Sequence, residues 1–202
     1  MTTTGAILRG YADAAHDQIA RMESFDPAVL LASVLPVLRS SPGRMLDVGA
    51  GTGYVAGWFI ERGYEATAAE PVAAFRDAGE RIRGDRVRWL DDRAPQLAVV
   101  RALGERFDLI LLSAVWQHLD EPDRTEAMES LSALLAEGGQ VVLSLRHGPG
   151  AATRPVFACT ADEAVALGAR HGLSVRLRVE AASLQVVNRA SGVTWTWLVL
   201  ER

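Results

Sequence analysis

The chain has 202 residues, of which 49% are hydrophobic and 23% charged, and it carries a net charge of −4. These proportions are typical of a globular protein of one domain, and the negative charge disfavours a nucleic-acid partner. The single cysteine, Cys159, excludes an intramolecular disulfide. We find no apolar run of about 18 residues and no signal-peptide pattern at the start, so we expect a cytoplasmic protein without a membrane partner. No feature specifies an oligomeric state.

Two helical patterns form an N-terminal segment over residues 1–40. The first places apolar side chains from Leu8 to Met22 along one helical face. The second begins near Asp26, whose carboxylate suits an N-cap, and Pro27 suits the first helical position. A serine-serine-proline-glycine run then interrupts the chain. We expect this segment to cover a pocket in the remainder of the same domain.

Strand-like and helix-like segments alternate over residues 44–202. Strands are predicted at 44–49, 65–70, 87–91, 107–114, 140–146, 173–181 and 193–202, and helices at 51–62, 72–83, 95–103, 120–137 and 161–171. The last two strands have no helix between them, so they should pair antiparallel at an edge. The order predicts an α/β fold, with a doubly wound, mostly parallel, seven-stranded Rossmann-like sheet. It has an antiparallel C-terminal edge strand and is preceded by two helices.

A glycine-rich turn follows the first predicted strand in the segment "LDVGAGTG". Its glycines, Gly49, Gly51 and Gly53, occupy every second position. In a doubly wound sheet the ligand lies beyond the carboxyl ends of the strands, next to the first strand. A turn there must pass close to the ligand, and glycine permits that approach and positive φ angles. The turn therefore predicts a ligand-binding loop.

The spacing of the glycines and a preceding acid bear on the type of ligand. A dinucleotide fingerprint needs a third glycine, but Tyr54 or Ala56 stands at that position, depending on the register. The fingerprint tolerates alanine, so spacing alone leaves both readings open. Asp47 is more informative, because a carboxylate suits a cationic ligand better than a pyrophosphate.

This segment resembles the first motif of the class I S-adenosylmethionine-dependent methyltransferases. Three further segments agree in order with motifs of that family: "EATAAEP", "FDLILLSAVWQHL" and "LLAEGGQVVLSLR". The resemblance implies S-adenosylmethionine as cofactor and a methyl-transfer reaction. It also implies that Glu70 accepts both ribose hydroxyls and that Asp91 or Asp92 contacts the adenine, with a slight preference for Asp91. The implied cofactor-binding residues are Asp47, Gly49, Ala50, Gly51, Thr52, Gly53, Glu70, Pro71, Asp91, Asp92, Ser113, Ala114 and Val115.

Candidate catalytic and substrate-binding residues lie near the same strand ends. His118 follows the fourth strand and suits a general base near neutral pH, although it could instead bond to the start of the next helix. Arg146 and His147 follow the fifth strand, where a guanidinium could bind a substrate carboxylate or phosphate. The alternative for Arg146 is an ion pair with a neighbouring acid.

Three more residues are candidates for contact with the substrate. Tyr11 and His16 would contribute if the N-terminal helix closes over the pocket, although core packing is an alternative for Tyr11. Trp116 is either a wall of the pocket or part of the core. Trp195 and Trp197 alternate on the last strand, which indicates packing.

Several absent patterns narrow the expected substrate. The fourth strand ends in "SAVW" rather than the proline-rich tetrad of enzymes that methylate amino groups of bases, and no proline precedes Cys159. No acidic cluster predicts a metal site. We therefore expect transfer to an oxygen or nitrogen of a small molecule or peptide side chain, without metal. The alternatives are a protein that binds the cofactor without catalysis and a nicotinamide-dependent oxidoreductase.

Overall fold

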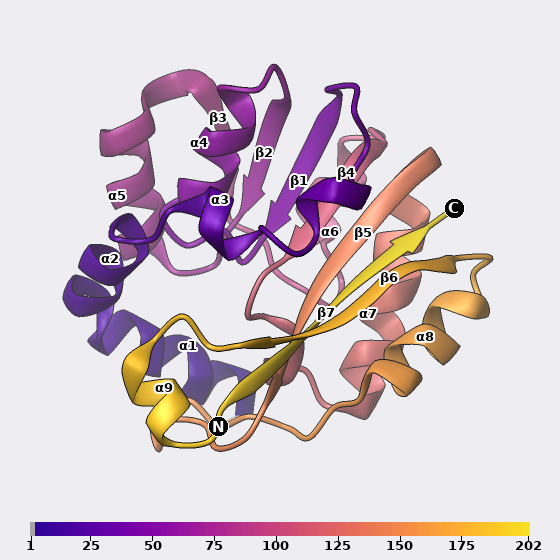
Figure 1. Ribbon diagram of the computed structural model, residues 1–202. Coiled ribbons are helices and arrows are strands. Elements are labelled where there is room, and N and C mark those ends of the chain that lie inside the picture. The colour runs from indigo at the N-terminus through magenta and orange to yellow at the C-terminus, as the bar shows by residue number, and fades with distance from the viewer. Residues whose placement is uncertain (1–2) are drawn as a thin grey trace.

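The computed structural model describes residues 3–202, which form a seven-stranded sheet flanked by helices (Figure 1). The strand order is β3-β2-β1-β4-β5-β7-β6, and every neighbouring pair is parallel except the two pairs that include β7. The strands are β1 (Arg44–Val48), β2 (Glu65–Ala69), β3 (Val87–Leu90), β4 (Phe107–Leu112), β5 (Leu135–His147), β6 (Ser174–Ala182) and β7 (Thr194–Glu201). The predicted fold class is confirmed, and the order reverses beside β1.

Two apolar clusters lie on opposite faces of the sheet because successive strand residues point to opposite sides. One cluster includes side chains of α6 (Ala98–Ala102), α7 (Glu121–Leu134) and α8 (Ala161–Ala169). The other includes side chains of α4 (Tyr54–Ile60) and the segment after α3 (Pro27–Leu30), which continues into the short helix η1 (Leu35–Val37). The central strands are buried on both faces, as a parallel sheet requires.

Helices α1 (Thr3–Asp13) and α2 (Ala15–Glu23) lie at the carboxyl ends of β1 and β2 (Figure 1). Helix α9 (Val186–Ala190) lies beside the end of β5, where Arg146 contacts Asn188. The single helix predicted for the first apolar stripe is divided at Ala14, which has φ −100° and ψ 13°. The break turns α2 toward α5 (Ala73–Arg83), which it contacts. The described N-terminal segment thus covers the sheet edge where a ligand is expected.

The C-terminal strands differ from the prediction in detail. They pair antiparallel at the edge of the sheet, as expected, but β6 is the edge strand and β7 lies between β5 and β6. The continuous pairing of β7 with β5, from Gln140↔Glu201 to His147↔Thr194, buries the end of β7 on both faces. The alternating exposure of β6 is that of an edge strand.

Several further elements and boundaries differ from the prediction. The short helix α9 separates β6 from β7, where no helix was predicted. α7 ends at Leu134, and β5 starts at the next residue, before the glycine pair predicted to end the helix. Two further short turns of 3-10 helix are η2 (Gly84–Arg86) and η3 (Trp116–His118). Within the described residues, no helix combines the length and apolar character needed to cross a membrane.

Candidate active site

The glycine-rich loop leaves β1 in a conformation that only glycine adopts readily. Gly49, Gly51 and Gly53 have φ angles of +68°, +58° and +67°. A Cβ at Gly49 would lie 2.5 Å from Cγ2 of Val115, and one at Gly51 would lie 2.5 Å from Sδ of Met22. The glycines are therefore required both by backbone conformation and by the close approach of neighbouring side chains.

Glu70 directly follows β2 and joins the loop to the start of α5. Its Oε2 accepts a hydrogen bond from the backbone N–H of Gly51 at 2.8 Å, and its Oε1 accepts one from Val72, also at 2.8 Å. The residue is 4% exposed. Burial raises the pKa of Glu70 to about 7, although the two amide donors act in the opposite direction. The carboxylate thus fixes the loop and still retains lone pairs for further donors.

Asp47 lies beneath the same loop and is 3% exposed. Its Oδ2 is buried and has no hydrogen-bond partner among residues 3–202. Burial, followed by the charge of Glu70, raises the pKa of Asp47 to about 7. A buried carboxylate oxygen without a partner is costly, and positive charge nearby would favour the ionised form, although Asp47 lines neither of the cavities described below.

The two acids predict a specific pH dependence. The pKa values of Asp47 and Glu70 are about 7 in the folded protein, against ordinary values of 3.8 and 4.5. At a pH between the ordinary value and about 7, the folded protein therefore holds protons that the unfolded chain has released. Stability of the ligand-free protein should therefore fall as pH rises from 5.5 to 8. We expect the opposite trend for affinity toward S-adenosylhomocysteine, because ionised carboxylates accept hydroxyl donors better.

Thermal denaturation across this pH range, with and without S-adenosylhomocysteine, measures both trends. The variant Glu70→Gln, which cannot ionise at this position, should show a weaker dependence than the unchanged protein. A ligand-free melting temperature that is constant or rises with pH would contradict the expectation.

Asp91 and Asp92 follow β3 and have different partners. Asp91 is exposed and forms an ion pair with Arg76 at 3.1 Å. Asp92 accepts hydrogen bonds from the backbone N–H groups of Arg93 at 2.8 Å and Val100 at 2.9 Å. Neither lines the cavity between the glycine loop and helices α1 and α2, which is described next, although Arg93 does. The carboxylate of Asp92 is thus occupied by backbone donors, which leaves Asp91 as the more available of the two.

A cavity of about 160 Å³ lies between the glycine loop and helices α1 and α2. Met22 and Phe75 contribute to its walls, which are mainly apolar. Its volume is below the roughly 300–1,000 Å³ typical of pockets for drug-sized ligands. Nine predicted site residues line it, namely Tyr11, Gly49, Gly51, Glu70, Pro71, Ser113, Ala114, Val115 and His118.

His118 and Tyr11 form a hydrogen-bonded pair in the wall of this cavity. Tyr11 Oη lies 2.9 Å from Nε2 of His118, whose Nδ1 lies 3.1 Å from the carbonyl oxygen of Pro155. A carbonyl accepts only, so Nδ1 carries the proton and Nε2 accepts from the tyrosine. Burial lowers the pKa of His118, and the nearby Arg154 and Arg146 lower it further. The imidazole is therefore neutral at physiological pH.

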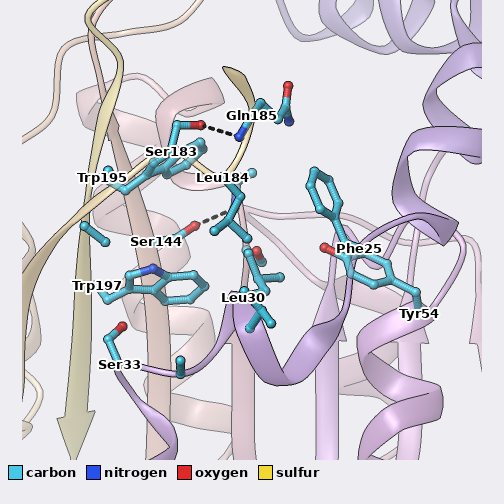
Figure 2. Close-up of a pocket in the computed structure, with 16 residues that line it drawn as sticks. Phe25, Leu30, Ser33, Tyr54, Ser144, Ser183, Leu184, Gln185, Trp195 and Trp197 are labelled. Carbon is cyan, nitrogen blue, oxygen red and sulfur yellow. Dashed lines mark hydrogen bonds between the residues drawn. The ribbon is translucent and has the colours of Figure 1, made fainter. Parts of the chain in front are cut away.

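A second cavity of about 260 Å³ lies on the α4 side of the sheet and is shown in Figure 2. Phe25, Leu30 and Tyr54 form one side of this second cavity, and Trp195 and Trp197 form the opposite side. Ser113 and Ala114 line both cavities, so the two meet at the carboxyl end of β4. 

The backbone at this shared wall is strained. Ala114 has φ +60°, which is unusual for a residue with a side chain. Its backbone N–H donates to the hydroxyl of the buried Ser144 at 2.7 Å. This bond holds the wall in place, and strain of this kind is concentrated at functional sites.

Four predicted substrate-binding residues line neither cavity, namely His16, Trp116, Arg146 and His147. His16 is exposed on α2, away from both cavities. Trp116 is fully buried in the core cluster beside α7, because it faces the opposite side of the sheet. His147 alternates with Arg146 on β5, and its Nε2 lies 2.8 Å from Oγ1 of Thr196.

Three loop residues predicted to bind the cofactor make contacts within the protein. Ala50 is buried in the cluster beside α4. The hydroxyl of Thr52 donates to Glu23 on α2, which also pairs with Arg83 at 2.7 Å. Gly53 begins α4 with a left-handed conformation. These residues shape the loop and attach α2 to it, and they do not line the cavity.

Sequence reasoning missed several residues that the fold brings to the site. Met22 and Phe75 lie on helices where only their apolar character was visible, and Arg154 lies in a loop without a motif. Trp195 and Trp197 were interpreted as packing residues, yet they line the second cavity. Their alternation with period two does place them on one face, which is the signal that was available.

The fold and the loop define a Rossmann-like domain with a cavity at the carboxyl ends of β1 and β2. A family model described as "Methyltransferase domain" matches residues 21–200. The chain therefore belongs to this family, and the resemblance to class I S-adenosylmethionine-dependent methyltransferases is confirmed. A search of curated proteins found no match.

Solved structures of methyltransferases share the fold. The 1,6-didemethyltoxoflavin-N1-methyltransferase of Burkholderia thailandensis, solved with S-adenosylhomocysteine, is 21% identical with a TM-score of 0.73 over 98% of this chain and 88% of that one. Magnesium protoporphyrin IX methyltransferase of Synechocystis PCC 6803 is 11% identical with a TM-score of 0.72 over 100% of both chains. The glycopeptide N-methyltransferase MtfA is 18% identical with a TM-score of 0.62 over 87% and 94%. At these identities the likeness establishes the fold.

Proposed function

We propose that the protein transfers a methyl group from S-adenosylmethionine to an oxygen or nitrogen of a small molecule or peptide side chain. The observation that carries the proposal is the convergence of the glycine loop, Glu70 and the His118–Tyr11 pair on one cavity. The methyltransferases of similar fold that were solved with S-adenosylmethionine or S-adenosylhomocysteine support the choice of cofactor.

The residues around the first cavity fit the parts of this cofactor. Glu70 would accept the ribose hydroxyls, the glycine loop would allow close approach of the nucleoside, and Asp47 would offset its positive charge. When bound, the cofactor supplies an activated methyl group on a sulfonium. The chain's own contribution is to align the two reactants and exclude water, which can lower the barrier by about 7–11 kcal/mol at best.

The cavity must enlarge to admit such a ligand. Its roof consists of α1 and α2, and Met22 lies directly over Gly51. We infer that this roof moves outward when the cofactor enters and then returns. Closure of the roof would exclude water from the reacting atoms.

The His118–Tyr11 pair provides a route for a proton that leaves the acceptor. Tyr11 Oη would receive the acceptor proton while its own proton passes to Nε2 of His118, which is neutral and holds a lone pair. The carbonyl of Pro155 holds the imidazole in the required tautomer. The pair thus acts as a general base only for acceptors that lose a proton during transfer.

Substitution of either member tests this role. For an acceptor that loses a proton, His118→Ala and Tyr11→Phe should each lower kcat by about 10²–10⁴-fold. His171→Ala, at the C-terminal side of α8, should leave kcat unchanged. Steady-state rates at saturating concentrations of both reactants measure the effect. An unchanged kcat in His118→Ala would remove this residue from the chemistry.

A screen of candidate acceptors tests the reaction itself. Pools of hydroxylated and amino-bearing metabolites and short peptides are incubated with the protein and labelled S-adenosylmethionine, and products are detected by the added methyl mass. We expect labelled product from at least one pool. Tight binding of S-adenosylhomocysteine together with no product in any pool would favour a binding module without catalysis.

A further inference from the structure

Two arginines near the His118–Tyr11 pair lack acidic partners. Arg146 is the penultimate residue of β5, and Arg154 lies in the following loop with its guanidinium 4.8 Å from the centre of the Tyr11 ring. Within residues 3–202, neither forms an ion pair with a carboxylate. Arg146 donates to the carbonyl of Pro149 at 2.7 Å and, at 3.4 Å, to Oδ1 of Asn188. Both of these acceptors are neutral.

Each guanidinium also has a buried nitrogen without a partner. Nε of Arg146 and Nη1 of Arg154 are buried and donate to no acceptor within the described chain. Burial, and also the charge of Arg154, lower the pKa of Arg146. Two cations that are close together, partly buried and unpaired are unfavourable unless an anion completes them. The planar fork of each guanidinium fits a carboxylate.

Arg146 contacts a residue that lines the second cavity. Its Cζ lies 5.6 Å from the centre of the Trp195 ring, and β5 and β7 pair Arg146 with Trp195 and Ser144 with Trp197. Arg146 and Ser144 therefore point to the same face of the sheet. Arg146 thus packs against Trp195, a residue that lines the cavity in Figure 2.

The second cavity itself suits an uncharged, flat group. Aromatic rings form two of its sides, and no residue that lines it carries a charge. Its volume of about 260 Å³ suits a ligand smaller than a typical drug-sized molecule. The hydroxyl of Ser144 accepts from Ala114, so its proton remains available to a ligand.

We propose that the methyl acceptor is a planar aromatic carboxylic acid whose ring occupies the second cavity and whose carboxylate binds Arg146 and Arg154. This inference rests on the proposed function. It places the acceptor next to the shared wall at Ser113 and Ala114, opposite the cofactor cavity. Neither arginine lines either cavity, but Arg146 contacts Trp195 in the wall of the second one, which favours the acceptor over the cofactor's own carboxylate as the anion.

Calorimetric titration with a matched pair of probes tests the proposal. The protein, loaded with S-adenosylhomocysteine, is titrated with 2-naphthoate and with its uncharged analogue 2-naphthamide. We expect naphthoate to bind at least about tenfold more tightly, because a hydrogen-bonded charge is worth this factor or more. Arg146→Gln and Arg154→Gln should each remove most of that preference. Arg170→Gln, an exposed residue at the end of α8, is the matched control and should keep it.

The outcomes separate this proposal from the proposed function. Equal affinity for the two probes, no binding of naphthoate, or a preference that survives both arginine substitutions would overturn the assignment of the acceptor. A loss of S-adenosylhomocysteine affinity in the arginine variants with an unchanged naphthoate preference would also overturn it and would assign the arginines to the cofactor. Failure of the unchanged protein to bind S-adenosylhomocysteine would instead contradict the proposed function. Melting temperatures identify variants that do not fold, and the comparison of the two probes on the unchanged protein needs no variant.

Discussion

Gly51→Val should weaken binding of S-adenosylhomocysteine by at least about 100-fold, which corresponds to about 2.7 kcal/mol. The backbone N–H of Gly51 donates to Glu70, and φ at this residue is +58°. A Cβ would lie 2.5 Å from Met22 Sδ, so the valine would enter the space between the loop and α2. The substitution therefore obstructs the cavity and disturbs the loop at the same point. Calorimetric titration measures the loss.

Gly104→Val separates this effect from backbone strain. Gly104 has a similar φ of +68°, but a Cβ there would meet no atom within 4 Å. Both variants should lose about 1–3 kcal/mol of stability from the strained backbone. Only Gly51→Val should also lose affinity for the ligand. Equal affinities in the two variants would show that the nucleoside binds elsewhere.

Glu70→Ala should reduce affinity for S-adenosylhomocysteine by about 10–100-fold, or about 1–3 kcal/mol, as expected for loss of a charged hydrogen-bond acceptor. The carboxylate is predicted to bind the ribose hydroxyls, and it also accepts bonds from the N–H groups of Gly51 and Val72. The substitution removes both contributions at once. The loss of affinity should be larger at pH 8 than at pH 5.5. Burial raises the pKa of Glu70 to about 7, so the side chain is a strong ionised acceptor for the ribose hydroxyls only at the higher pH.

Glu65→Ala is the matched control on the same strand. Glu65 begins β2 at the opposite edge of the sheet, and its exposed side chain pairs weakly with Arg44 at 3.6 Å. Its removal should leave ligand affinity within error of the unchanged protein and alter stability by less than about 1 kcal/mol. Titration of both variants at the two pH values completes the comparison. An unchanged affinity in Glu70→Ala would exclude this acid from the ribose site.

The strand-by-strand order of the chain could be predicted because it depends on local patterns. An apolar run such as the one from Phe107 to Leu112 indicates a strand that is buried on both faces. The alternating glycines Gly49, Gly51 and Gly53 indicate a turn with positive φ angles. The position of Glu70 follows from the same strand order. Boundaries were less predictable: the first helix breaks at Ala14, and β5 begins at Leu135, because tertiary contacts at helix ends outweigh local preference.

The cofactor loop and the acid of β2 could be read from the sequence because their conformations depend on residues next to them in the chain. The sequence by itself thus determined the family and the succession of strands along the chain, and it predicts the edge of the sheet where the ligand binds.

Tertiary structure alone decided which distant side chains meet. It placed Trp116 in the core, His16 in solvent and Arg154 against Tyr11, and it inserted β7 between β5 and β6. These outcomes depend on how separate elements pack against one another. The packing contacts join residues that are far apart in the chain, so a local sequence pattern does not predict them.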